Sequence, residues 1–196
     1  AIPDEAVTAA VDEPGLPLPQ IVQTVLQGYS DRPALGERAV EFVADPATGR
    51  TTARLLPRFD TITYGQLWDR VRATAAAWHE AGVTAGDRVA ILGFTSADYT
   101  AIDTALGQLG AVSVPLQTSS SPAALAPIVV ETEPRVIAAS VDHLPDAVEL
   151  ALTAHAPAQL VVFDHHPEVD DHRDALVAAR ERLDAAGLVV PLVTLA

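Results

Sequence analysis

The stretch that decides the fold runs from Arg88 to Leu116 and reads RVAILGFTSADYTAIDTALGQLGAVSVPL. Its first part, 88–94, is almost entirely apolar, as is typical of a strand buried on both faces. Residues 96–109 then carry apolar side chains at helical spacing, and Gly110 is suited to ending that helix. Residues 112–116 form a second apolar run. The stretch therefore predicts a strand, a helix and a second strand, the unit from which parallel sheets are built.

The same alternation continues to the end of the chain. Further strands are expected at 135–141, 159–164 and 188–195, and further helices at 121–131, 144–155 and 170–186, the last closed by Gly187. The strand segments are nearly all apolar, which indicates a parallel sheet covered by helices on both faces. We therefore expect an α/β fold, Rossmann-like in the broad sense, with right-handed crossovers between its strands.

The pattern differs before this α/β part. Residues 18–29 carry apolar side chains at helical spacing and predict a short amphipathic helix. Two extended runs lie between residues 38 and 64, separated by the turn residues 45–49, which indicates a β-hairpin. Pro57 falls in the second run, so we expect it at the edge of the hairpin or in a bend.

A longer helix should connect the hairpin to the sheet. Thr63 and Gln66 have the spacing of a capping box, and an Ala-rich amphipathic stretch follows up to residue 81. We expect three segments in one incomplete N-terminal subdomain: an extended lead-in over 1–17, the helix and hairpin over 18–64, and an α/β lobe over 65–196. The chain ends in or just after a strand, which fits a closing strand and an amputated lobe equally well.

Composition removes several classes of function. The formal net charge of −14 would cause repulsion from nucleic-acid phosphates and anionic membrane surfaces, so neither is expected as a partner. The sequence has no Cys, which excludes disulfides and thiolate chemistry. All twelve basic residues are Arg, so a P-loop or Schiff-base lysine is excluded. No apolar run approaches the ~20 residues that cross a bilayer, and no signal peptide opens the chain, so we expect a cytoplasmic protein.

Two predicted junctions between a strand and a helix are candidate anion sites. The first is Gly93-Phe-Thr-Ser96. Its single Gly does not make the G-x-G-x-x-G motif of dinucleotide-binding sites, and we favour the interpretation of Ser96 as a plain helix cap. Thr118-Ser119-Ser120-Ser121-Pro122 is the second, at the edge of the sheet where α/β proteins bind ligands. There, too, Ser121 as a cap with Pro122 in the first helical position is favoured over an anion site.

Residues 164–172, Asp-His-His-Pro-Glu-Val-Asp-Asp-His, are the richest set of metal-ligating side chains. His165, His166 and His172 could coordinate a divalent ion together with the neighbouring carboxylates. A solvated loop that runs into a helix N-terminus explains the same residues, and ligand count without geometry is weak evidence, so we favour the loop.

The remaining candidates have structural explanations. Trp68 and Trp78 are expected as core or interface anchors rather than as a stacking platform, and His79 as an ordinary helix residue. Nothing orders a Ser, a His and an Asp into a catalytic relay, and there is no nucleophile elbow. The residues alone therefore indicate an α/β lobe and no particular reaction.

Several strings of the sequence do resemble known enzymes. RLLPRFDTITYGQLWDR (54–70) looks like the entry to an adenylation domain, and GDRVAIL (86–92) and LGAVSVPL (109–116) resemble early sequence blocks of adenylate-forming enzymes. Longer strings are similar to carboxylic acid reductases: GFTSADY (93–99), VPLQTS (114–119), ETEPRVIAAS (131–140) and VDHL (141–144). This resemblance runs from about Leu18 to the end of the chain.

The resemblance implies a multidomain parent protein. In that family an adenylation domain uses ATP and Mg²⁺ to convert a carboxylic acid into an acyl adenylate. A phosphopantetheine thiol on a carrier domain takes the acyl group, and an NADPH-dependent reductase domain releases an aldehyde. The chain would then be the N-terminal part of the adenylation domain, with the rest of that domain, the carrier and the reductase as its partners.

The sequence also departs from the family pattern. The phosphate loop with its Lys, the acidic ribose-binding residue and the C-terminal subdomain with its catalytic Lys are all absent. We therefore assign no catalytic, cofactor-binding or metal-binding residue to any position, expect the chain alone to be inactive with no cofactor bound, and single out Thr118–Ser120 without a role. Two alternatives stay open. One is a fragment of an acyl-CoA synthetase or fatty-acid adenylating ligase, and the other is a free-standing, non-catalytic α/β binding module.

Overall fold

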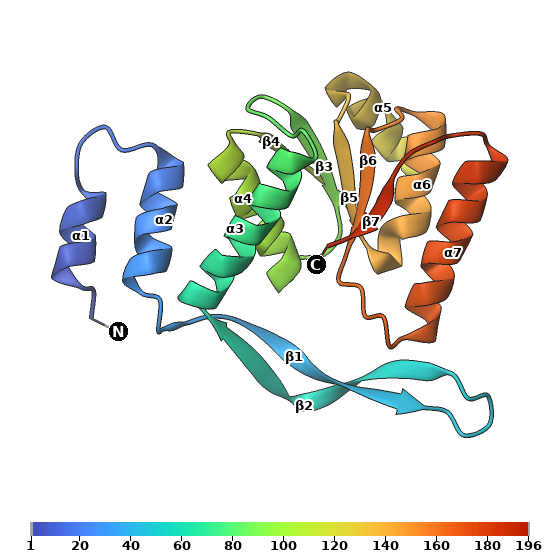
Figure 1. Ribbon diagram of the computed structural model, residues 1–196, viewed down its shortest axis with the longest axis horizontal. Coiled ribbons are helices and arrows are strands. Elements are labelled where there is room, and N and C mark those ends of the chain that lie inside the picture. Colours follow the sequence, from blue (N-terminus) through green and yellow to red (C-terminus); the bar gives the residue numbers. More distant parts are fainter. Residues whose placement is uncertain (1, 196) are drawn as a thin grey trace.

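A parallel sheet of five strands forms the body of the molecule (Figure 1). The computed structural model describes residues 2–195; Ala1 and Ala196, the outermost residues of the predicted lead-in and lobe, lie outside the described residues. The strand order is β4-β3-β5-β6-β7, and every neighbouring pair is parallel. These strands are β3 (Arg88–Leu92), β4 (Val112–Leu116), β5 (Val136–Ser140), β6 (Gln159–Phe163) and β7 (Leu192–Thr194). The predicted α/β fold is confirmed.

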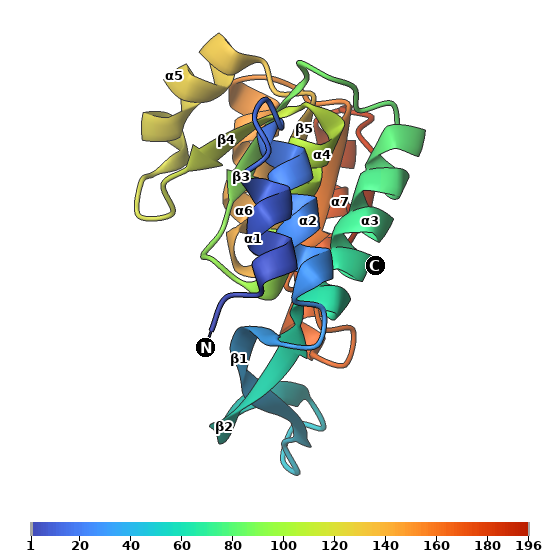
Figure 2. The ribbon, with the colours of Figure 1, turned by 90° about the vertical axis from the view of Figure 1, so that its left-hand side faces the viewer.

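Helices cover both faces of the sheet. The helices are α1 (Glu5–Val11), α2 (Leu18–Gly28), α3 (Tyr64–Glu80), α4 (Ala97–Leu109), α5 (Pro122–Thr132), α6 (Leu144–Thr153) and α7 (Asp170–Ala185), with a single 3₁₀ turn, η1 (Val141–His143). On one face α3 and α4 pack over Ile91 and Phe163, and on the other α5, α6 and α7 pack over Leu92 and Val162. Figure 2 shows α1 and α2 stacked outside the α3 and α4 layer. Among the described residues no helix is long and apolar enough to cross a membrane.

The predicted helix signals are confirmed in detail. Thr63 and Gln66 form both hydrogen bonds of the capping box at the start of α3. Gly110 has a φ of 67° and ends α4 in the left-handed region, where a glycine pays no steric cost. The last strand is shorter than predicted, because Leu188 still donates its N–H to the α7 carbonyl of Leu183 and the chain needs residues 189–191 to reach the sheet.

The expectation of an extended lead-in over residues 1–17 is wrong, because this segment contains α1. Asp4 caps that helix by accepting hydrogen bonds from the backbone N–H groups of Ala6 and Val7. The helix is then held against α2, where a Cβ on Gly28 would lie 2.4 Å from Val7 Cγ2. A helix of seven residues is marginal by itself, so this contact and the cap explain why it forms.

The hairpin consists of β1 (Pro33–Ala44) and β2 (Thr51–Thr63), which pair with each other in an antiparallel two-stranded sheet. The register moves from Arg38 opposite Phe59 to Val40 opposite Leu55, which leaves the three residues around Pro57 facing one residue of β1. Pro57 therefore lies in a β-bulge, as its missing N–H requires. In Figure 1 the hairpin extends below the sheet as a long ribbon.

Gly93→Ala should destabilise the protein by about 1–3 kcal/mol, the usual cost of overpacking a core. A Cβ at this position would lie 2.6 Å from Cζ of the fully buried Phe163 and 3.1 Å from Ser140 Cβ. Gly107→Ala is the matched control, because its Cβ would meet nothing within 4 Å and alanine favours a helix interior by about 0.5–1 kcal/mol. Urea unfolding checks both variants, and equal stability of the two would contradict the proposed close packing.

Candidate functional site

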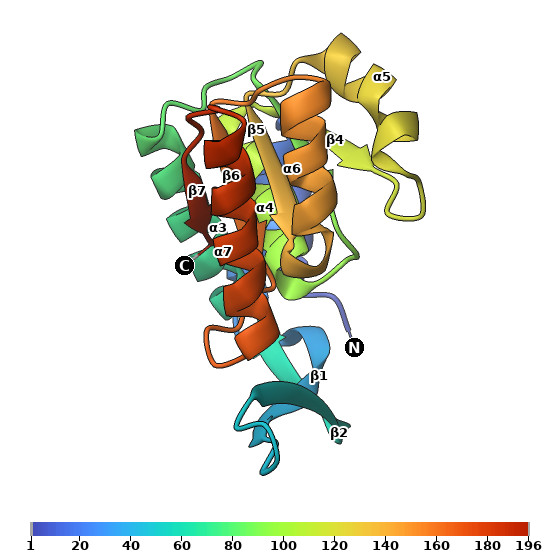
Figure 3. The same cartoon turned by 90° about the vertical axis from the view of Figure 1, so that its right-hand side faces the viewer.

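The carboxyl ends of the sheet strands form the edge where ligands bind in open α/β sheets. The chain leaves β3 for β4 on one side and returns to β5 on the other, so the strand order reverses at β3. The helices α4, α6 and α7 begin at this edge, and the hairpin runs along it (Figures 1 and 3). Any site of this chain that follows the general rule for α/β folds therefore lies between the sheet edge and the hairpin.

A cleft of about 460 Å³ occupies this position. The hairpin contributes Glu37, Arg38, Val40 and Leu55 to its walls, α3 contributes Arg70, the start of α4 contributes Ser96 and Asp98, and the loop after β6 contributes Asp164, His165 and His166. The lining thus combines two guanidinium groups with three carboxylates and two imidazoles. Arg70 Nη1 lies 3.6 Å from Asp98 Oδ1, so one of the two guanidinium groups is already paired.

The first predicted junction is closed by acceptors from the protein itself. Ser96 caps α4 by accepting the N–H of Tyr99 at 3.1 Å. Glu37 Oε1, which comes from the hairpin, accepts the N–H of Ala97 at 2.7 Å. These groups take the place that an anion would occupy at a helix N-terminus. The interpretation of Ser96 as a structural cap is confirmed.

The second predicted junction is occupied in a similar way. Ser121 caps α5 by accepting the N–H of Ala124 at 3.4 Å, and Pro122 stands in the first helical turn with no N–H to offer. Ser119 Oγ accepts a hydrogen bond from Gln117 Nε2 at 3.0 Å within the same turn. The structure thus favours the capping role of Ser121. Thr118 and Ser120 lie at the carboxyl end of β4, and we assign them no role.

Asp164 is the most unusual ionisable group of the cleft. Its backbone has a φ of 53°, a left-handed conformation that Asp tolerates better than most residues. Its N–H donates to Asp98 Oδ2 at 3.1 Å. Burial raises the pKa of Asp164 to about 6, the charges of Asp98 and Glu37 add to the shift, and a hydrogen bond with Ser96 opposes it. Near pH 6, therefore, this carboxyl group exchanges its proton.

The three histidines of the predicted metal cluster lie close together but face one another rather than a shared centre. The backbone N–H of His166 donates to His172 Nδ1 at 3.0 Å, and the two rings stack with their centroids 5.7 Å apart. Burial lowers the pKa of His172 and of His165, which favours neutral imidazoles at pH 7.

The carboxylates next to these histidines have other partners. Asp170 accepts the N–H of Thr51 and pairs with Arg173, and the Thr51 hydrogen bond lowers the pKa of Asp170. Asp171 pairs with Arg50 of the hairpin at 2.6 Å. Within residues 2–195 no group of three or more His, Asp or Glu side chains converges as a metal site would require.

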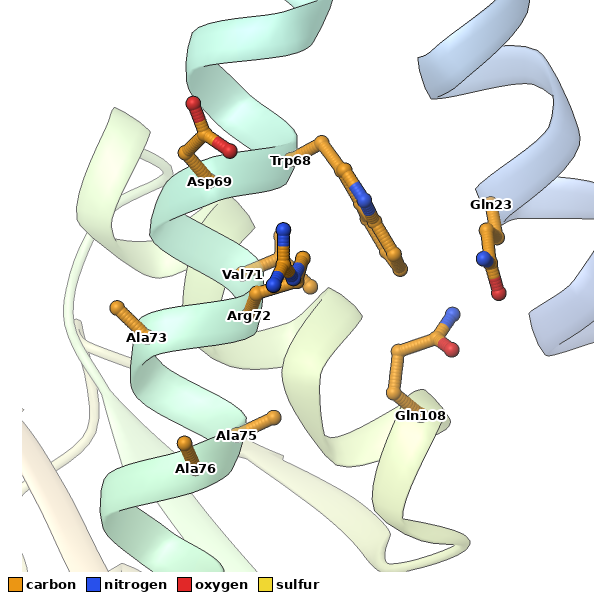
Figure 4. Close-up of a pocket in the computed structure, with 9 residues that line it drawn as sticks. All are labelled: Gln23, Trp68, Asp69, Val71, Arg72, Ala73, Ala75, Ala76 and Gln108. Carbon is orange, nitrogen blue, oxygen red and sulfur yellow. The ribbon is translucent and has the colours of Figure 1, made fainter.

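The two tryptophans are buried, in agreement with the sequence, and His79 is exposed in the last turn of α3. Trp78 belongs to the core beneath α3 and α4, and Trp68 to a smaller core between α2, α3 and α4. Figure 4 shows Trp68 beside an open cavity of about 610 Å³, with Gln23 and Gln108 facing it from α2 and α4. Gln108 uses its amide to donate to the Pro19 carbonyl, so this cavity is a packing groove between helices.

Sequence reasoning missed the residues that the hairpin brings to the edge. Glu37 contacts Ala97 across sixty positions of sequence, and Arg50 contacts Asp171 across 121. Phe94, of which 72% is exposed, lies with its ring centroid 5.8 Å from that of His143 at the point where the strand order reverses. Of these three residues, only Phe94 could have been noticed in the sequence, because it directly follows a predicted strand.

Charges of both signs line the cleft. The α4 N–H groups that could hold a phosphate donate to Glu37 and Ser96, and Asp164 and Asp98 add negative charge beside them. Two arginines stand in the cleft, and one of them is paired with Asp98. At the start of α4, therefore, the N–H groups of Ala97 and Tyr99 already have acceptors from this chain.

Asp164→Asn should change how stability depends on pH. The carboxyl group is protonated in the folded protein at pH 5 but ionised in the unfolded chain, so Asp164 lowers the stability of the wild type as pH rises from about 4 to 6. The variant lacks this loss, so its stability relative to wild type should increase between pH 4 and pH 7. Urea unfolding at a series of pH values tests this, with Glu181→Gln, an exposed carboxylate on α7, as the control. Parallel pH curves for wild type and Asp164→Asn would contradict the raised pKa.

Known proteins resemble this chain over most of its length. Residues 28–187 match the family described as AMP-binding enzyme. The carboxylic acid reductase of Mycobacterium marinum is 57% identical over 193 residues, which are 98% of this chain and 16% of that protein. This chain therefore spans only about a sixth of the length of that relative.

Two solved structures from Segniliparus rugosus match over nearly the whole chain. The A domain of its carboxylic acid reductase, in complex with AMP and a co-purified carboxylic acid, has a TM-score of 0.94 and 47% identity over 99% of this chain and 31% of that one. The A-PCP didomain, in complex with AMP, also has a TM-score of 0.94 and 47% identity, over 100% of this chain and 28% of that one. The chain therefore belongs to the AMP-binding enzyme family, and within it corresponds to the N-terminal part of the adenylation domain of a carboxylic acid reductase.

Proposed function

We propose that this chain is the structural support of an active site that activates a carboxylic acid with ATP and Mg²⁺ to give an acyl adenylate. The acyl group is then transferred to a phosphopantetheine thiol on a carrier domain and reduced with NADPH to an aldehyde. The likeness to carboxylic acid reductases, including an A domain in complex with AMP and a carboxylic acid, supports the substrate class. The A-PCP didomain supports a carrier as the neighbouring domain.

The observation that carries the supporting role is that side chains of this chain cap the N-termini of α4 and α5, the helices that follow β3 and β4. Ser96, Glu37 and Ser121 accept the N–H groups that a phosphate would need, and the sequence has no lysine to stabilise a developing negative charge. The phosphate-binding and catalytic residues of the activated complex are therefore supplied by other parts of a longer protein, and no residue of this chain is a catalytic residue.

A supporting segment of this kind affects the reaction rate because it helps to keep the reacting groups in the correct geometry. Catalysis by adenylation requires the carboxylate and the α-phosphorus to be held in line, and small displacements of the supporting structure are costly. The buried sheet gives this part of the domain a defined shape. Changes in this chain should consequently act on the amount of folded, correctly assembled domain rather than on the ionisation of a catalytic group.

The test is carboxylate-dependent exchange between ATP and pyrophosphate. The longer protein that contains this segment should catalyse exchange with aromatic or aliphatic acids, and the 196-residue chain should show only the background seen without a carboxylic acid. Exchange by the chain alone would overturn the supporting role. Absence of exchange in the longer protein, across both classes of acid, would overturn the adenylation proposal itself.

A second assay separates the related enzyme classes. A carboxylate reductase should form an aldehyde and oxidise NADPH after adenylation, and this activity should require the phosphopantetheine on the carrier. An acyl-CoA synthetase should instead release acyl-CoA when free coenzyme A is added and should leave NADPH unchanged. Formation of acyl-CoA without aldehyde would assign the chain to that alternative.

A further inference from the structure

The two halves of the hairpin are held to the body of the molecule in different ways. The half next to the helices is held by the chain itself, because Thr63 begins α3 and the N–H of Tyr64 donates to the carbonyl of Arg32. Glu37 adds the hydrogen bond to Ala97 at the start of α4. This proximal half therefore moves with α3 and α4.

No residue of the distal half, residues 40–55, is completely buried. All of these residues are described, and each is either exposed or partly exposed. Its strands pair only with each other, and an isolated two-stranded ribbon is marginal in water. Segments with few buried apolar contacts open at low free energy. The distal half accordingly depends on its contacts at the far end to remain in place.

Those contacts form one cluster on the first turns of α7. Arg50 Nη2 lies 2.6 Å from Asp171 Oδ1 and 2.6 Å from Asp174 Oδ2, and the N–H of Thr51 donates to Asp170 Oδ2 at 2.5 Å. Phe42 adds a ring contact with His166, with centroids 5.5 Å apart. We call the ion pairs of Arg50 with Asp171 and Asp174 the latch. Its side chains are 44%, 73% and 65% exposed, so the latch is weak and reversible.

A β-bulge lies between the two halves. The bulge places the three residues around Pro57 opposite Ala39, so the ladder is interrupted there, and Pro57 has no N–H for a ladder bond. Beyond it, Val40 and Leu55 are the first cross-strand pair, and both line the cleft at the sheet edge. Movement about the bulge therefore moves one wall of the cleft while Glu37 and Arg38 on the other side of the bulge keep their places.

We propose that the distal half of the hairpin, residues 40–55, is a strap that swings about the bulge at Ala39 and Pro57 and is closed over the carboxyl edge of the sheet by the Arg50 latch. Opening of the strap widens the cleft from one side, and closing restores the wall formed by Val40 and Leu55. The inference goes beyond the proposed function, because it depends only on the contacts of this chain and not on adenylation.

Hydrogen exchange of the full 196-residue chain, followed by mass spectrometry, tests the strap. Arg50→Ala removes both ion pairs of the latch and should raise exchange in peptides covering 40–55 by about three- to tenfold, as expected for the loss of two exposed ion pairs. Exchange in peptides covering 33–38 and in α4 should not change. Arg54→Ala is the matched control, because Arg54 pairs with Glu41 inside the hairpin at 3.0 Å and leaves the latch intact.

Variants that reverse the charges of the latch distinguish its loss from a general loss of stability. Arg50→Glu should increase exchange in residues 40–55 further than Arg50→Ala, because it repels Asp171 and Asp174. The double variant Arg50→Glu with Asp174→Arg should return exchange toward the wild-type rate. The proposal is wrong if Arg50→Ala and Arg54→Ala give the same exchange, if the double variant shows no recovery, or if both halves of the hairpin exchange faster together.

Discussion

The whole structure depends on strand β3 being paired along both edges and covered on both faces. Its N–H and C=O groups pair with β4 on one side and β5 on the other, so residues 89–92 can be both apolar and buried. Val89 and Ile91 pack beneath α3 and α4, whereas Ala90 and Leu92 pack beneath α5 and α6. Because β3 is fixed in all four directions, the turn that follows it is fixed as well, and this turn determines where α4 starts and where the cleft lies.

Charge is then distributed so that the lobe satisfies its own dipoles. The positive ends of helices at the sheet edge meet acidic and hydroxyl side chains of the same chain, including Glu37 from the hairpin and Asp170 in the first turn of α7. The sequence has no lysine, and Arg50 uses its guanidinium group to bind two carboxylates of α7. These contacts join the hairpin to the starts of α4 and α7.

The sequence predicted those features whose signals are local. Thr63, Ser96 and Ser121 cap helices because the partner N–H is only three residues away, and such spacing is visible without a structure. The parallel sheet was predictable because its strands are continuous apolar runs. The hairpin's attachment could not be predicted, because the Glu37 and Arg50 contacts join residues that no periodicity relates. The short helix α1 was missed although its cap, Asp4, is a local signal, because seven residues are marginal as a helix and their packing against Gly28 is not visible in the composition.

The distance in sequence between Arg50 and its partners has a consequence during synthesis. The ribbon emerges from the ribosome before the sheet exists, and its partner Asp171 follows 121 residues later. At typical translation rates of about 5–20 residues per second, the ribbon waits roughly 6 to 24 seconds before α7 can receive it. During that interval its two edges and the exposed rings of Phe42 and Phe59 are open to any neighbouring strand. The arginines and acidic residues along the ribbon then serve a second purpose, because edge charges discourage pairing with another nascent chain.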